Sequence, residues 1–204
     1  MEHNLLAISP LDGRYSSKVD YLSQYFSESA LMRYRILIEI EWLIFLFNEL
    51  KLPGTKPFKP TELKILRSIY EQFDVINAKR IKEIEKITNH DVKAVEYFIK
   101  ESVKGGSIEK WNEFIHFGCT SEDINNLSYS CMIRDFLERE YAPVMSGLVQ
   151  DLYEMAVDYK AVAMLSRTHG QPASPTTVGK ELINVVARLE RELCMLEEGN
   201  YLMG

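Results

Sequence analysis

The 204-residue sequence lacks the marks of several large protein classes. Its only cysteines, Cys119, Cys131 and Cys194, match no CxxC or zinc-binding spacing and are best explained as reduced, buried thiols. The first residues lack the basic and apolar regions of a signal peptide, and the most apolar segment, residues 36–47, is too short to span a bilayer. A net charge of −6 argues against a general binder of nucleic acid or anionic membranes. We therefore expect a cytoplasmic protein with no nucleic-acid or membrane partner.

Alternating strand patterns are also almost absent, and apolar residues recur with the period of a helix. The segments with this period in the first half of the chain are short and are separated by prolines and glycines. They predict helices over residues 27–50, 61–73, 76–87 and 92–104. The sequence therefore predicts an all-α fold.

The predicted helices lengthen in the second half of the chain. Residues 137–159 and 182–196 each carry a single apolar stripe, which is typical of the helices of a bundle. The change from short to long helices places a domain boundary near the start of this second half, at about residues 105–120. We expect a small N-terminal helical domain at residues 1–112 and the first part of a central helical-bundle domain, incomplete here, at residues 113–204.

Two long amphipathic helices bury each other poorly, so a bundle of these two alone would expose large apolar faces. The last residues, 201–204, add apolar side chains and no polar tail. Either the chain oligomerises extensively or it is the first part of a longer polypeptide. We favour the second explanation, which does not exclude oligomerisation.

Three of the four histidines, His90, His116 and His169, lie in polar segments that lead into predicted helices. Such junctions place imidazoles, hydroxyls and amides where the backbone N–H groups and the helix dipole favour an anion. An imidazole titrates near neutral pH and is suited to proton transfer. The pattern indicates a site for a negatively charged substrate.

Capping signals support the position of these helix starts. Thr88 and Thr120 each precede an aspartate by three residues, a variant of the capping box. After the third histidine, Ser174 is suited to an N-cap and Pro175 to the first helical position. The simpler alternative is three ordinary helix starts with incidental histidines.

Four segments carry a more specific signal. They read SPLDGRY from residue 9, TNHDVKAVEYF from residue 88, FIHF from residue 114 with TSEDINN from residue 120, and SRTHGQPASPTT from residue 166 with GKE from residue 179. In this order and spacing they resemble the adenylosuccinate lyase family of the fumarase/aspartase superfamily. The match runs from residue 9 to about residue 191, nearly the whole chain.

The resemblance implies an all-α homotetramer with active sites shared between subunits at the corners of a long helical bundle. It implies cleavage of adenylosuccinate to AMP and fumarate, and the parallel cleavage of the succinylated aminoimidazole carboxamide ribotide in purine biosynthesis. The reaction is a β-elimination, in which a base removes a proton next to a carboxylate and an acid protonates the departing nitrogen. No metal or organic cofactor is expected.

The resemblance also implies which residues act on the leaving group. His169 matches the general acid that protonates the purine-side nitrogen, and Gln171 lines the site. Asn89, His90 and Asp91 match a segment that contacts the substrate. Within it, the imidazole of His90 helps to orient the substrate and the general acid.

Further residues match the positions that bind the two anionic ends of the substrate. Arg14 and Tyr15 match the pair that holds the nucleotide phosphate, for which a guanidinium fork and a phenolic hydroxyl are suited. Thr120 and Ser121 match the pair that holds a succinyl carboxylate at a helix N-terminus. His116 lines the site.

One part of the family pattern is missing. The family's base is a serine on a loop of pattern Ser-Ser-x-Met-Pro-x-Lys-x-Asn-Pro, and the only Ser-Ser pair here, Ser16-Ser17, is followed by Lys-Val-Asp. We therefore expect the 204-residue chain alone to have little or no lyase activity. The alternatives are another superfamily member, such as argininosuccinate lyase or fumarase, and a non-catalytic helical module that serves assembly.

Overall fold

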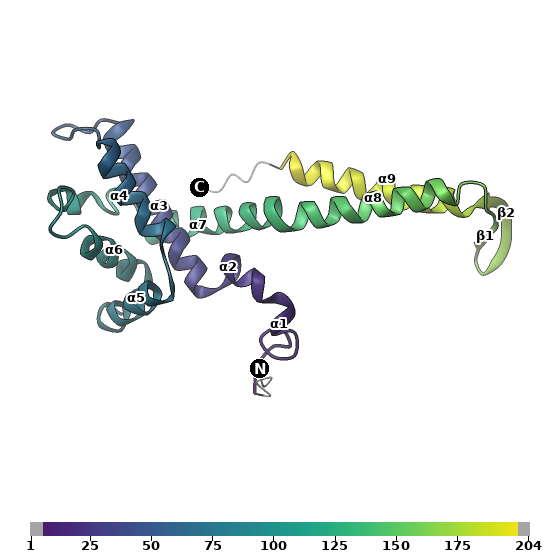
Figure 1. The fold of residues 1–204 in the computed structure, drawn as a ribbon, viewed down its shortest axis with the longest axis horizontal. Coiled ribbons are helices and arrows are strands. Elements are labelled where there is room, and N and C mark those ends of the chain that lie inside the picture. Colours follow the sequence, from purple (N-terminus) through teal and green to yellow (C-terminus); the bar gives the residue numbers. More distant parts are fainter. Residues whose placement is uncertain (1–5, 200–204) are drawn as a thin grey trace. The chain divides into compact units, whose positions relative to one another are not determined.

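The computed structural model of the chain describes residues 6–199 (Figure 1). These residues form two compact units, residues 6–134 and residues 135–199. Both units are mostly helical, which confirms the main feature of the predicted fold class. The domain boundary predicted between residues 112 and 113 falls inside the first unit. The division into an N-terminal domain and a bundle domain concerns the full-length protein, and it stays a prediction. The apolar end predicted at residues 201–204 lies outside the described residues.

The first unit contains the short helices that the sequence predicts, together with brief helical turns before the first long one. In chain order its elements are α1 (Ser16–Val19), the 3₁₀ turn η1 (Asp20–Leu22), α2 (Ser23–Phe26), α3 (Glu28–Asn48), α4 (Pro60–Glu71), α5 (Val75–Thr88), α6 (Asp91–Ser102), the 3₁₀ segment η2 (Glu109–Phe114) and α7 (Ser121–Phe136), whose last two residues belong to the second unit.

Helix α3 forms the centre of the first unit because it is apolar on more than one face. Ser27 caps it by accepting a hydrogen bond from the N–H of Ala30 at 3.1 Å. The side chains of Ile36, Ile40 and Phe47 are fully buried. Helices α4, α5 and α6 all contact α3, so the core of this unit surrounds it.

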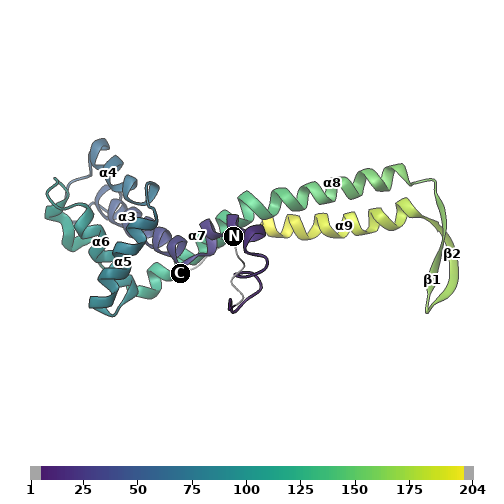
Figure 2. The ribbon, with the colours of Figure 1, turned by 60° about the horizontal axis from the view of Figure 1, so that its bottom comes forward.

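The second unit is a pair of helices joined by a β-hairpin. Its elements are the π-helical turn η3 (Leu137–Tyr141), α8 (Ala142–Asp158), β1 (Ala163–Thr168), β2 (Gln171–Thr177) and α9 (Val178–Glu197). Pro143 lies in the first turn of α8, directly after the widened turn η3, where its missing N–H breaks no regular helical hydrogen bond. Helices α8 and α9 lie side by side in Figure 2, and the hairpin connects them.

The hairpin corrects the predicted start of the last helix and adds two strands to the all-α prediction. Strands β1 and β2 pair antiparallel, with Ala163 opposite Thr177 and an irregularity between Leu165 and Arg167. Ser174 and Pro175 lie within β2 instead of opening a helix. The N-cap of α9 is Thr177, whose hydroxyl accepts from the N–H of Lys180 at 3.1 Å. Prolines are tolerated because a two-stranded sheet has only edge strands.

Helices α8 and α9 meet closely at the end nearest the hairpin. A Cβ at Gly179 would lie 2.3 Å from the carbonyl oxygen of Ala156, so only glycine fits there. The apolar side chains buried in this unit, Val149, Ala156 and Val186, form a narrow contact. Val144, on the stripe predicted for α8, is 70% exposed. As expected for two amphipathic helices alone, much of their apolar surface is uncovered.

Cysteine burial differs from the prediction. Cys119 and Cys131 are half-buried and Cys194 is exposed, so none of the three is fully buried as predicted. None of the three forms a disulfide among the described residues. Among residues 6–199 no helix is both long and apolar enough to cross a membrane.

Candidate active site

Two of the three predicted histidine-bearing junctions come together in the first unit. His90 is the N-cap of α6, and its Nδ1 accepts a hydrogen bond from the N–H of Lys93 at 3.2 Å. This contact assigns the proton of the neutral imidazole to Nε2. That nitrogen lies 3.5 Å from Oγ of Ser121, the first residue of α7. The starts of α6 and α7 are therefore neighbours, as a shared anion site requires.

The capping-box spacing is realised at only one of these junctions. Asp123 accepts from both the N–H and the hydroxyl of Thr120, at 2.6 and 2.8 Å, and these bonds lower the pKa of Asp123. Thr88 caps no helix, contrary to the prediction, because it is the last residue of α5. The imidazole of His90 takes the capping role there.

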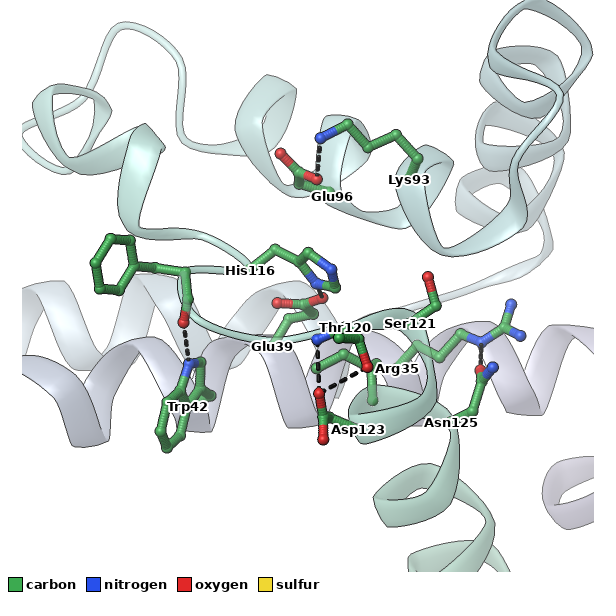
Figure 3. A network of polar contacts seen from close by, with 12 residues as sticks. Arg35, Glu39, Trp42, Lys93, Glu96, His116, Thr120, Ser121, Asp123 and Asn125 are labelled. Carbon is green, nitrogen blue, oxygen red and sulfur yellow. Dashed lines mark hydrogen bonds and ion pairs between the residues drawn. The ribbon is translucent and has the colours of Figure 1, made fainter. Parts of the chain in front are cut away.

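A buried arginine that the sequence reasoning missed ties the two junctions together. Arg35, on α3, has a side chain only 7% exposed. Its Nη2 donates to Oδ2 of Asp91 at 2.7 Å. Its Nε donates to Oδ1 of Asn125 at 2.9 Å, the bond that Figure 3 shows. Burial would raise the pKa of Asp91, but the N–H of Val92 and the charge of Arg35 outweigh it and lower that pKa. Asp91 is therefore an ionised anchor for the start of α6.

His116 is paired with a second charged residue of α3. Its Nδ1 lies 2.6 Å from Oε1 of Glu39, whose side chain is completely buried. The hydrogen bond to Glu39 raises the pKa of His116. The backbone beyond His116 is held by Trp42, whose indole N–H donates to the carbonyl of Phe117 at 2.9 Å. The sequence signal for Glu39 is a charged residue between two isoleucines in a mostly apolar helix.

Backbone conformation also marks the predicted site. Among residues 6–199 the non-glycine residues with positive φ are Lys51, Asn89, His116 and His169, and three of these four are predicted site residues. The left-handed region is unfavourable for residues with a Cβ and is retained where the surroundings impose it, often at functional sites. The φ values of Asn89 and His116, 51° and 63°, belong to the turns that lead to α6 and α7.

A cleft of about 380 Å³ opens beside the first junction. Asn89, His90 and Asp91 contribute polar groups to its lining, and α3 and α5 contribute apolar side chains. Its lining residues are Glu28, Leu31, Met32, Arg35, Ile81, Glu85, Asn89, His90 and Asp91. A concave site with a few convergent polar groups is suited to a small ligand.

Arg14 and Tyr15 contact each other directly before α1. The guanidinium of Arg14 donates to the hydroxyl of Tyr15 and lies 4.6 Å from the centre of its ring. Tyr15 is the N-cap residue of the short helix α1. The pair presents an exposed guanidinium and a phenolic hydroxyl together, the donors that a phosphate requires.

His169 lies in the second unit, at the tip of the β-hairpin. It and Gly170 have φ values of 49° and 75°, and two positive φ values between Thr168 and Gln171 define a type I′ turn. The whole of β2 separates His169 from α9, so it is not beside a helix N-terminus as predicted. Its imidazole is exposed, as is Gln171 at the start of β2.

Comparison with known families decides the classification. The sequence model of a family described as lyase matches residues 13–202, almost the entire chain. The chain belongs to this lyase family. The resemblance found in the sequence motifs is thereby confirmed, whereas the roles of the individual site residues stay predictions.

Several curated relatives in the lyase family are named adenylosuccinate lyase. The protein of Haemophilus influenzae is 47% identical over 199 residues, which cover 97% of this chain and 44% of that protein. The protein of Dictyostelium discoideum is 49% identical over 201 residues, covering 96% and 43%. The Escherichia coli K12 protein is 43% identical over 196 residues, with the same coverage. The chain thus spans less than half the length of these relatives.

Solved structures share the fold at low sequence identity. A fumarate lyase from Mesorhizobium sp. BNC1 superimposes with a TM-score of 0.69 at 18% identity, covering 88% of this chain and 39% of that one. A β-carboxy-cis,cis-muconate cycloisomerase from Acinetobacter calcoaceticus sp. ADP1 gives 0.63 at 19% identity, covering 88% and 40%. These similarities show that the chain has the same fold as the matched part of each enzyme.

Proposed function

We propose that a polypeptide containing this chain at the full length of its relatives cleaves adenylosuccinate to AMP and fumarate. By the same reaction it would cleave the succinylated aminoimidazole carboxamide ribotide, and both steps belong to purine biosynthesis. The observation that carries the proposal is the meeting of His90 and Ser121, 3.5 Å apart, at the starts of two helices. The adenylosuccinate lyases that match nearly the whole chain support the choice of substrate.

The proposed chemistry is a β-elimination. Thr120 and Ser121 bind a succinyl carboxylate at the N-terminus of α7, where helix N–H groups favour an anion. A base takes the proton next to a carboxylate, the electron pair forms the C=C bond of fumarate, and the C–N bond breaks. His169 donates a proton to the departing nitrogen. Fixed donors stabilise the intermediate carbanion without reorganising during the reaction.

The remaining predicted residues position the substrate. His90, between Asn89 and Asp91, orients it at the cleft beside α3. His116 and Gln171 line the site.

The chain should supply only part of this machinery. The base-carrying loop pattern is not in the sequence, so we expect no measurable fumarate from adenylosuccinate with the 204-residue chain alone. A full-length protein should release fumarate and AMP in equal amounts, quantified by liquid chromatography. Fumarate released by the purified chain would refute the assignment of the base to the missing loop. A full-length protein that releases no fumarate would favour the non-catalytic assembly module instead.

We further propose that the full-length protein is a homotetramer with shared active sites. The broad uncovered apolar surface of α8 and α9 supports this, because such faces are normally covered by other helices. The same surface is the feature that favours an assembly module, so it does not by itself distinguish the two functions.

Arg14 should matter for binding more than for chemistry. In the full-length protein, Arg14→Ala should raise KM for adenylosuccinate by about 10- to 150-fold with a smaller effect on kcat, since a hydrogen bond to a charged group is worth about 1.5–3 kcal/mol. Steady-state kinetics measure both constants. Arg33→Ala is a matched control, because Arg33 also lies over the ring of the tyrosine that follows it, at 4.4 Å. Equal effects of the two substitutions would contradict the role of Arg14.

A further inference from the structure

Glu39 is a buried carboxylate with an unusual lack of partners. It lies on α3 and its side chain is completely shielded from solvent. Its Oε1 is 2.6 Å from Nδ1 of His116, and its Oε2 has no hydrogen-bond partner among the described residues. An ionised carboxylate in such a place is strongly disfavoured unless a positive charge compensates it. The environment of Glu39 therefore requires a proton on the pair that it forms with His116.

Other cations near this pair are already engaged. Arg35, one turn earlier on α3, bonds to Asp91 and Asn125. The ammonium groups of Lys93 and Lys100 lie 2.7 and 3.0 Å from Glu96, a buried carboxylate on α6. His116 is thus the group that balances the charge of Glu39.

The other titratable groups that face His116 do not replace it in this role. Glu96 and Lys93 face it from α6 with opposite effects on its charge. Asp123 faces it from α7 and is held by Thr120. Cys119 lies in the connecting loop, and burial raises its pKa to about 11, so it is a neutral thiol at pH 7.

We propose that Glu39 is a positioning residue that keeps His116 protonated and directs its Nε2–H to the anion site at the start of α7. The ligand this site would take is a carboxylate, and that part rests on the proposed function. Nδ1–H of His116 donates to Glu39, which leaves Nε2–H as the free donor of an imidazole that is 20% exposed. Figure 3 shows the ring of His116 above Glu39, with Thr120 and Ser121 in the same close view.

Electrostatics at the start of α7 agree with this arrangement. The pKa of Asp123 is lowered by hydrogen bonds from Thr120 and further by the charge of His116, so the imidazolium acts on the first turn of α7. A full positive charge there adds to the partial positive charge of the helix N-terminus.

The pair of Glu39 and His116 also stabilises the fold in a defined pH range. Because the folded pKa of His116 is raised, this stability is complete below its unfolded pKa and is lost as pH rises through the folded value.

Histidine titration by nuclear magnetic resonance tests the proposal on this chain without any enzyme assay. The His116 signals, assigned with His116→Gln, should titrate with a midpoint above about 6.5, the ordinary value for histidine. Glu39→Gln should lower that midpoint by about one unit or more, because an opposite charge at hydrogen-bond distance shifts a pKa by about 1–3 units. Glu41→Gln is the matched control. It removes another carboxylate of α3, one that pairs with Arg67 at 2.8 Å, and should leave the midpoint unchanged.

A wild-type midpoint at or below about 6.5 would overturn the proposal, as would equal midpoints in the wild type and Glu39→Gln. If Glu39→Gln does not fold, the wild-type midpoint still decides. In the full-length protein, the inhibition constant of fumarate as a competitive inhibitor should be about tenfold higher for Glu39→Gln than for Glu41→Gln at pH 7. This factor corresponds to a loss of about 1.4 kcal/mol of binding free energy. A full-length protein without lyase activity would refute the proposed function while the titration remained decisive for Glu39.

Discussion

Replacing His169 with alanine in the full-length protein should lower kcat for adenylosuccinate by about two to four orders of magnitude, the usual contribution of a general acid. The departing nitrogen is a poor leaving group unless it is protonated, so the loss should appear in turnover. KM should change much less, because the imidazole acts mainly in the transition state. Steady-state fumarate release measures both constants.

The turn that carries His169 allows a sharper version of this experiment. Alanine is strained at a φ of 49°, so His169→Ala perturbs the type I′ turn as well as removing the acid. His169→Asn removes the acid but creates Asn-Gly, the preferred pair for this turn. We expect kcat to fall as far with asparagine as with alanine. Wild-type turnover in His169→Asn would show that the geometry of the hairpin matters and that the imidazole is not the acid.

The helices of the first unit could be predicted from the sequence because apolar period and capping residues act locally. Ser27 caps α3, and residues 76–87 fall within α5. The Thr120-to-Asp123 spacing likewise gave the start of α7, where both partners belong to one turn of chain. These features depend on neighbours within a few residues.

The hairpin could not be predicted by the same means. Its strands are short, mostly exposed and rich in proline, so they lack the apolar alternation that marks a strand. Ser174-Pro175 is a good local signal for a helix start, yet pairing with β1 prevails over it. Thr177 then takes the capping role. A local signal failed where a contact between two chain segments decided the conformation.

Only the residues of the candidate site that stand in sequence motifs could be predicted. Its histidines and hydroxyls stand in recognisable motifs, and His90 and Ser121 do meet. Their anchors, Arg35 and Glu39, are two of several charged residues in the mostly apolar helix α3, and a sequence does not reveal which distant group such a charge faces. That information resides in the packing of α3 against α6 and the loop before α7.

The packing around α3 leads to the second large prediction. Phe47→Ala should lower the free energy of unfolding of the first unit by about 3–5 kcal/mol, the usual result of deleting a buried phenylalanine ring. The ring is fully buried, with ring centroids of Phe58, Trp111 and Phe114 at 4.5, 5.0 and 5.2 Å. Urea unfolding followed by tryptophan fluorescence reports on this unit, because both tryptophans of the chain, Trp42 and Trp111, lie in it.

A matched control lies two residues away on the same helix. Phe45 is 42% exposed, so Phe45→Ala should cost about 1 kcal/mol or less. Equal losses for the two variants would contradict the central role given to α3. The comparison also bears on the site, because Trp111 and Phe114 belong to η2, which leads directly to His116. If the aromatic cluster holds that loop, Phe47→Ala should weaken the contact of His116 with Glu39, and the titration midpoint of His116 should fall in the folded variant.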